Sequence, residues 1–519
     1  MLNHKSINFF LILLILVIFI FDYFYRNSSK NFDFELSWDE VNIINAVQKG
    51  FFENAFEKNS LNFIKFITIG YDKINNPKNI SDISEKTLLN EYTDIDDVFI
   101  LRNFHPPFLI YYLNFFLDDD TYIQDLKLNL AQNIIGYTIL FIIFYFLIYK
   151  KDLNFFNKIS ILFILYIFLN SLLFQSSISR INFHVFFSFI LLIYMFNFLN
   201  YYNYRTKVNF YKFILCSSLL LISLETSIII ISSSLIILIY DSYKKKNDFY
   251  EYFYYFILTI IIFIIIWPAN LYNFTLIKTY LMYFYRFFFA FENEYSHLNL
   301  YQFLYNFLIT NLYLFILILP IVIFCYKKIL KNNTYNIYLF FSAIYFLLII
   351  PFAHNITYIF PSLVLLIFYL CNLVSEINYN NKINLILIFI VFLFSGYSYL
   401  DNYKNKNYQI SPIKSLIKDI NNLNINDPKI LADGSHIIKY YSDYNNIYNI
   451  SFYEKYNPKF YIRVKNDFFN LNKIISEGFF DIIIINKLRN YSDNDLVLFR
   501  DLKYHNIENN FYHIFYKDY

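Results

Sequence analysis

The chain has 519 residues, of which 57% are hydrophobic and only 16% are charged, and its formal net charge is +3. This composition excludes an ordinary soluble globular protein and indicates an integral membrane protein. A charge so close to neutral in so long a chain also argues against a nucleic-acid partner.

Apolar stretches of the length that a transmembrane helix needs recur from the N-terminus to residue 400. We expect the first to remain as an anchor, because no small-residue cleavage pattern follows it. The short fifth and sixth stretches form either two spans or one re-entrant hairpin around Glu225. The sequence predicts about eleven spans, near residues 7–25, 128–149, 157–175, 183–200, 209–223, 226–240, 252–268, 306–326, 336–351, 358–374 and 383–400.

Basic residues predict the orientation of these spans, because cytoplasmic loops are enriched in Lys and Arg. With the N-terminus in the cytoplasm, the basic loop residues fall on the cytoplasmic side: Lys150, Lys151, Lys158, Arg205, Lys207, Lys244, Lys245, Lys246, Lys327, Lys328, Lys331 and Lys382.

The expected fold class is therefore a mainly α membrane protein of the inner (plasma) membrane, with two extracytoplasmic parts. Residues 1–400 form the polytopic transmembrane domain, whose first extracytoplasmic loop, 26–127, carries juxtamembrane helices. Residues 401–519 form a small extracytoplasmic α/β domain, with strands expected at 429–432 and 479–485.

An acidic pair, Asp39 and Glu40, follows the first span. Ser37 and Glu40 have the spacing of a capping box, and the apolar residues that follow, Val41, Ile44, Val47, Phe51 and Ala55, predict an amphipathic helix. Glu40 therefore either satisfies backbone donors at this helix start or binds substrate. Asp39 is either a favourable first-turn acid or a catalytic carboxylate that faces a cavity.

A second motif, His105-Pro106-Pro107, stands before the next span, with Arg102 three residues earlier. Proline is favoured at the first helical position, so the motif by itself predicts only a helix that begins near Phe108. A histidine and an arginine against the membrane surface, in the same loop as the acidic pair, also suit an anionic headgroup.

In this order, the acidic pair and the helix that begins with His-Pro-Pro resemble the GT-C superfamily of membrane glycosyltransferases, specifically bacterial protein O-mannosyltransferases and aminoarabinose transferases. The resemblance covers most of the chain, and three further segments are similar to family motifs: 179–183, 266–268 and 358–361. Two departures are that Ile-Asn follows Arg180 in place of Pro-Tyr, and that no Arg precedes Tyr358.

The resemblance implies transfer of a sugar from a polyprenyl-phosphate donor to a glycan, lipid or protein acceptor at the extracytoplasmic face. Asp39 would be the general base. The expected substrate-binding residues are Glu40, Arg102, His105, Arg180, Glu225 and Tyr358. Arg180 is equally explained as an anchor at the lipid headgroups, and for Arg286 the anchor is the favoured explanation.

The short cytoplasmic loops support a lipid-linked donor independently, because they leave no room for a nucleotide-sugar domain and contain no glycine-rich phosphate motif. The sequence requires no cofactor and leaves a divalent metal open, with Asp94, Asp96 and Asp97 as either ligands or a solvated loop. The competing functions are a transporter or flippase of lipid-linked saccharides and a surface-polysaccharide polymerase or ligase.

Overall fold

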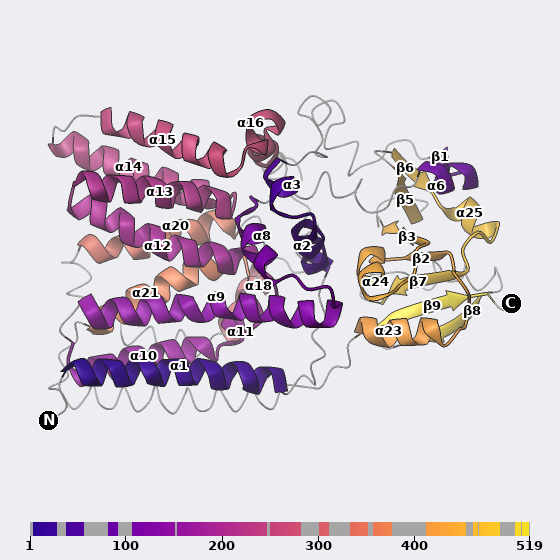
Figure 1. Ribbon diagram of the computed structural model, residues 1–519, viewed down its shortest axis with the longest axis horizontal. Helices are drawn as coiled ribbons and strands as arrows, with labels where there is room; N and C mark the ends of the chain where they lie inside the picture. The colour runs from indigo at the N-terminus through magenta and orange to yellow at the C-terminus, as the bar shows by residue number, and fades with distance from the viewer. Residues whose placement is uncertain are drawn as a thin grey trace.

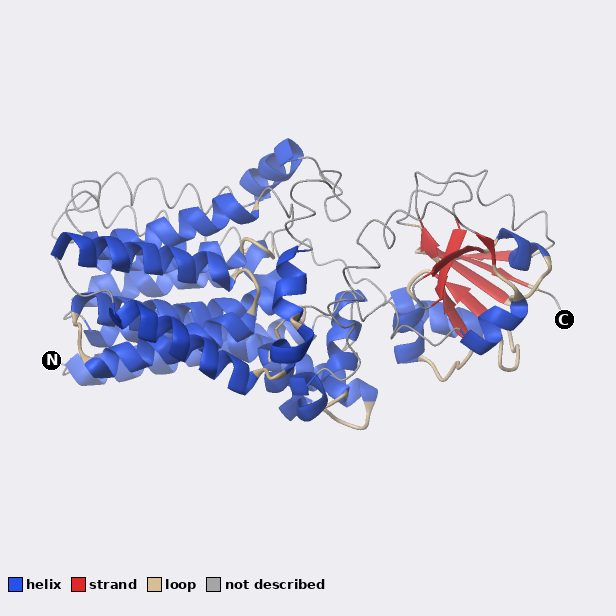
Figure 2. Ribbon diagram, turned by 90° about the horizontal axis from the view of Figure 1, so that it is seen from above, coloured by secondary structure: helices blue, strands red, loops and turns tan. Residues whose placement is uncertain are grey.

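The computed structural model is mainly helical, with a small sheet region near the C-terminus (Figures 1 and 2). The residues that it describes are 4–28, 38–56, 81–91, 106–150, 153–245, 250–281, 300–310, 333–350, 357–375, 412–452, 460–464, 467–487, 504–509 and 511–517.

Long helices lie side by side and form a bundle (Figure 1). Its pairing is dominated by contacts of α12 with α13 and α9, of α20 with α21, and of α13 with α15. The bundle helices are α1 (His4–Ser28), α9 (Thr121–Lys150), α10 (Phe155–Leu169), α12 (Phe183–Asn203), α13 (Lys207–Ser223), α14 (Ser227–Lys245), α15 (Tyr250–Ile266), α20 (Asn333–Ile349) and α21 (Phe360–Ser375).

Among the described residues, four helices are long and apolar enough to cross a membrane, and they lie within α1, α9, α12 and α14. Shorter apolar helices correspond to α10, α15, α20 and α21. The chain is thus a helical membrane protein by length and composition, while the number of eleven spans stays a prediction. The predicted span 383–400 lies outside the described residues, as does the part of 306–326 beyond Thr310.

One predicted span, 157–175, is not a continuous helix. Helix α10 ends at Leu169, and a separate short helix, α11 (Leu172–Ile178), follows after Asn170 and Ser171. The Ser171 hydroxyl accepts a hydrogen bond from the backbone N–H of Phe174 at 3.1 Å and so caps α11. Hydropathy alone missed this break because the residues on both sides of the cap are apolar.

Short helices gather at one end of the bundle, away from the N-terminus (Figure 1). They are α2 (Trp38–Gln48), α3 (Phe51–Phe56), α8 (Phe108–Leu113) with the 3-10 turn η1 (Asn114–Phe116), α16 (Ala269–Asn273) and α18 (Leu300–Thr310). The small sheet-containing domain lies beyond the same end of the bundle.

The small domain contains two sheets. The five-stranded sheet has the order β3 (Ile447–Asn449), β2 (Ile430–Ala432), β7 (Ile482–Asn486), β9 (Tyr512–Tyr516) and β8 (His505–Glu508), with β2 parallel to both of its neighbours. The four-stranded sheet has the order β1 (Ser81–Asp82), β6 (Asp467–Asn470), β5 (Phe460–Val464) and β4 (Ser451–Phe452).

The five-stranded sheet is buried on both faces, which explains why β7 reads as four consecutive isoleucines. Ile482 and Ile484 pack with helices α23 (Pro412–Asn421) and α24 (Ser435–Tyr441). Ile483 and Ile485 face a second core that includes β5 and helix α25 (Asn472–Ser476). The strands predicted at 429–432 and 479–485 thus correspond to β2 and β7, although β7 begins only at Ile482.

The first predicted extracytoplasmic loop contributes to this small domain. Strand β1 pairs in parallel with β6, and the side chain of Asn470 donates a hydrogen bond to the Asp82 carboxylate at 2.9 Å. Helix α6 (Glu85–Glu91) follows β1, and both Ile83 and Leu88 are buried in the second core. The small domain is therefore assembled from two segments that are far apart in the sequence.

Candidate functional site

Helix α2 carries the acidic pair and lies where the bundle meets the small domain (Figure 1). Val41, Ile44 and Val47 form its fully buried face, as the predicted periodicity requires. The helix ends at Gln48 because Gly50 takes a φ of 84°, and the chain then turns into α3. This turn corrects the predicted continuous helix, since Phe51 leaves the buried face and is exposed.

Asp39 lies in the first turn of α2, and its side chain is outside the part that the structure describes. Glu40 is 1% exposed, and its Oε1 accepts a hydrogen bond from the backbone N–H of Ile181 at 2.6 Å. This donor stands 141 residues away along the chain rather than at the helix start of Glu40 itself. The carboxylate therefore ties α2 to the segment that precedes α12.

The segment 179–182 is also held by amide side chains of α9. Asn129 donates to the carbonyl oxygen of Ser179 at 3.4 Å, and Gln132 donates to that of Asn182 at 3.5 Å. Arg180 stands between these contacts and is exposed. The segment that carries Arg180 is thus fixed from two sides, while the arginine itself remains open to solvent or ligand.

Tyr358 and the start of α12 come together at the same end of the bundle. The rings of His184 and Tyr358 are 4.3 Å apart, and the Asn182 side chain caps α12 by accepting from the backbone N–H of His184 at 2.8 Å. His184 is buried and Tyr358 is half-buried. Tyr358 therefore contacts the first turn of α12, directly after the segment that contains Arg180.

The helix that begins after Pro106 and Pro107 meets the segment around Trp267. The Tyr111 hydroxyl donates to the carbonyl oxygen of Ile266 at 3.2 Å, and Trp267 is fully buried. Helix α8 also contacts α2, because the Asn114 amide donates to the carbonyl oxygen of Val47 at 2.9 Å. Five of the segments identified from the sequence thus share one end of the bundle: the helix with the acidic pair, the helix after Pro106 and Pro107, and segments 179–183, 266–268 and 358–361.

Glu225 lies in the turn between α13 and α14 and is buried. Its backbone carbonyl accepts a hydrogen bond from the Tyr280 hydroxyl at 2.9 Å, and the neighbouring Thr226 hydroxyl is 2.9 Å from that of Tyr345. The turn is therefore packed against other helices. The helices on either side are 17 and 19 residues long.

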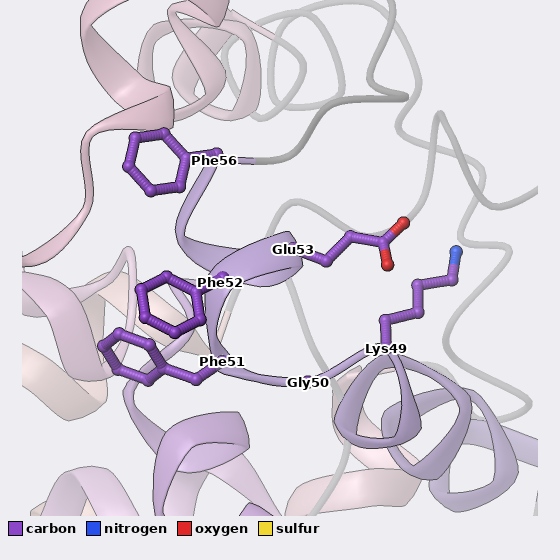
Figure 3. A pocket seen from close by; sticks show the side chains of 6 residues that line it. All are labelled: Lys49, Gly50, Phe51, Phe52, Glu53 and Phe56. Carbon is purple, nitrogen blue, oxygen red and sulfur yellow. The ribbon is translucent and has the colours of Figure 1, made fainter.

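An open cavity of about 690 Å³ lies beside the α2–α3 turn. Phe51, Phe52 and Phe56 point to one side, while Lys49 and Glu53 extend to the other (Figure 3). The Phe51 ring packs on that of Tyr111 at 4.4 Å. This cavity offers an aromatic wall and a charged rim near the start of α8.

Two groups of buried polar residues were missed in the sequence. Along α9, Gln124, Asp125, Asn129, Gln132 and Asn133 are all buried. In a chain this rich in Asn, amides carried no recognisable signal. The one available clue was that five polar residues stand near the start of an apolar stretch at spacings of one, three or four.

The second group joins α1 to α9. Arg26 binds the Asp22 carboxylate and the Asn133 amide oxygen, each at 2.8 Å, and the Tyr137 hydroxyl donates to Asp22 at 2.8 Å. Arg26 is buried. A buried arginine and carboxylate inside a membrane bundle are costly unless they are paired, which these contacts achieve.

Arg102 and His105 lie outside the described residues, as do Asp94, Asp96 and Asp97. Within the described ranges, no group of three or more His, Cys, Asp or Glu side chains is arranged to hold a metal ion. Searches of protein-family models, curated proteins and solved structures found no match to this chain.

Proposed function

We propose that this protein is an integral-membrane glycosyltransferase that moves a sugar from a polyprenyl-phosphate donor to a glycan, lipid or protein acceptor at the extracytoplasmic face. The observation that carries the proposal is the hydrogen bond between Glu40 and the backbone of Ile181. It joins the helix start that bears Asp39 to the segment that bears Arg180.

The proposed chemistry divides between these two segments. Asp39 accepts the proton of the acceptor hydroxyl as that oxygen attacks the anomeric carbon. The bond between the anomeric carbon and the phosphate oxygen then breaks, and the lipid phosphate leaves with the electron pair. Arg180, together with Arg102 and His105, neutralises the phosphate, for which a guanidinium is well suited. Glu40 and Tyr358 shape the substrate site, and Glu225 lies in an outer turn.

The membrane orientation of the proposal follows the distribution of basic residues. The segment with Arg205 connects α12 to α13 at the end of the bundle opposite to α2, and Lys150 and Lys244 stand at or near the ends of α9 and α14. Placing this basic end in the cytoplasm puts α2, α8 and the small domain outside. Helices of 17 and 19 residues favour two spans over a re-entrant hairpin at 207–245.

The test is transfer from a panel of polyprenyl-phosphate sugars by purified protein in lipid, followed as release of free polyprenyl phosphate. We expect Asp39→Asn to lower turnover by about 10²–10⁴-fold, because a general base contributes that much. Glu85→Gln serves as the matched control, because Glu85 is an exposed acidic residue in the first turn of α6. Asp39→Asn with wild-type turnover would refute the role of the base.

A transporter or flippase of lipid-linked saccharides is the second candidate, and the buried Arg26–Asp22 pair favours it. Paired charges inside a bundle often mark a transport pathway. Labelled lipid that crosses the bilayer equally in wild type and Asp39→Asn, with no phosphate release, would support transport. If Asp22→Asn abolished this movement of lipid across the bilayer, the transport pathway would be assigned to the Arg26–Asp22 pair.

A further inference from the structure

A buried carboxylate joins the bundle to the small domain. Asp125, near the start of α9, accepts hydrogen bonds from the hydroxyls of Tyr440 at 2.7 Å and Tyr441 at 3.0 Å. The neighbouring Gln124 amide donates to the Tyr440 hydroxyl at 2.9 Å. We call these four residues, Gln124, Asp125, Tyr440 and Tyr441, the tyrosine clasp.

The tyrosine clasp is buried and hydrogen-bonded, as a strong contact between the bundle and the small domain requires. Asp125 is only 3% exposed, and hydrogen bonds to a charged acceptor are stronger than neutral ones. Burial raises the pKa of Tyr440 well above its usual value, with Asp125 adding to the effect, so the hydroxyl remains protonated and able to donate. The two tyrosine rings also meet edge to face at 4.9 Å.

Helix α24, which ends in these two tyrosines, also packs against α2. Helix α24 contacts α2, and Ile437 and Ile438 of α24 belong to the same apolar cluster as Val41 and Val47. On the bundle side, Glu40 ties α2 to Ile181. Helix α2 is therefore held between the small domain and the segment that bears Arg180.

We propose that the tyrosine clasp positions the proposed active site: by fixing α24 against the bundle, Asp125 sets where the start of α2 stands relative to Arg180. This inference rests on the proposed function. Asp125 is a positioning residue and takes no part in the chemistry. Without such a clasp, interfaces between domains of one chain are commonly mobile, and α2 would move with the small domain.

The first measurement is the distance between two spin labels, independent of any activity. One label replaces Phe115, which is exposed at the bundle end, and the other replaces Lys418, which is exposed on α23. We expect a narrow distance distribution that broadens in Asp125→Asn and in Tyr441→Phe. Tyr444→Phe is the matched control, because its hydroxyl binds Asn421 at 2.6 Å within the small domain.

The second measurement is turnover by the same variants. We expect Asp125→Asn to lower kcat about 10–100-fold, because a misplacement near 1 Å has effects of that size. The donor KM and the shape of the pH profile should not change, since no phosphate ligand or proton-transfer group is removed. Tyr444→Phe should match the wild type in both measurements.

An unchanged distance distribution in the clasp variants would overturn the inference, whatever the activity. A broadened distribution with unchanged kcat would also overturn it, because the clasp would then hold the domain without setting the site. A wild-type protein that is inactive on every donor, while its clasp variants broaden, would refute the proposed function and leave the clasp as the device that places α24.

Discussion

The bundle and the small domain place their polar and apolar side chains in opposite ways. The bundle exposes large apolar residues, such as Phe21, which is 72% exposed, and buries Arg26, Asn129 and Gln132. The small domain buries every isoleucine from Ile482 to Ile485. An apolar surface on the bundle is suited to contact with lipid. A domain that buries its apolar strands on both faces of the sheet is suited to an aqueous environment.

This difference changes what a buried residue signifies in each region. In the small domain a buried isoleucine contributes to folding and carries no further information. In the bundle, burial of an apolar residue says little about its role, because an apolar side chain can face either protein or lipid, and lipid is as apolar as leucine. There the buried polar groups are informative, and one set of them joins α9 to the C-terminal end of α1.

The largest effect should come from breaking a polar pair inside the bundle. Asp22→Ala leaves the Arg26 charge buried without its carboxylate, which costs about 3–5 kcal/mol. The matched control is Asp118→Ala, which removes the exposed pair with Lys127 and costs about 1 kcal/mol or less. Thermal unfolding in detergent measures both. Equal losses of stability in the two variants would show that an unpaired charge costs no more inside the bundle than at an exposed site.

The next effect tests whether residues 81–91 belong to the small domain. Leu88→Ala removes a fully buried side chain from the second core and should cost about 2–5 kcal/mol. Leu89→Ala is the control, since Leu89 is 51% exposed and its loss should stay within about 0.5 kcal/mol. Hydrogen exchange of β5 and β6 reports the result, and wild-type protection in Leu88→Ala would contradict the shared core.

Two glycines should respond differently to the same substitutions. A Cβ on Gly136 of α9 would stand 2.5 Å from Cγ2 of Ile178, so Gly136→Ala should cost about 1–3 kcal/mol. Gly50 has open space but a φ of 84°, so Ala should cost about 1–2 kcal/mol there. Asparagine adopts this conformation readily, so Gly50→Asn should be tolerated and Gly136→Asn should not. Equal tolerance at both sites in unfolding experiments would reject this explanation.

The smallest effect concerns pH. The pKa of Tyr440 is raised in the folded protein, so its stabilising contribution is complete below pH 10 and is lost as the pH rises, because the unfolded chain then releases the proton first. At pH 10.5 the loss should be at most about 1 kcal/mol. Comparing the pH dependence of unfolding in wild type and Tyr440→Phe isolates this contribution, and identical curves would exclude it.

Local patterns were sufficient for several elements. The buried face of α2, the start of α12 and the strands β2 and β7 follow from spacing and from turn residues. Hydropathy also found α1, α9, α12 and α14. It did not separate α10 from α11, because the break depends on the capping hydroxyl of Ser171 in an apolar stretch.

Contacts between distant segments could not be read from the sequence. One partner of Glu40 is a backbone N–H in another segment, and a backbone donor has no sequence signature. Strand β1 has two residues and forms only because β6 offers an edge. The clasp requires that the end of α24 meet the start of α9, which depends on how the two domains dock. For Asp39, Arg102 and His105 the catalytic and binding roles stay predictions.

The pairing of β1 with β6 has a consequence for biosynthesis. Asp82 and Asn470 are separated by 388 residues, so the ribosome completes the partner strand about 20–80 s after it completes the first. During that interval most of the bundle helices emerge, and β1 has no partner strand to pair with. The four-stranded sheet can therefore be completed only after β6 has been made, which is after the bundle helices that precede it in the chain.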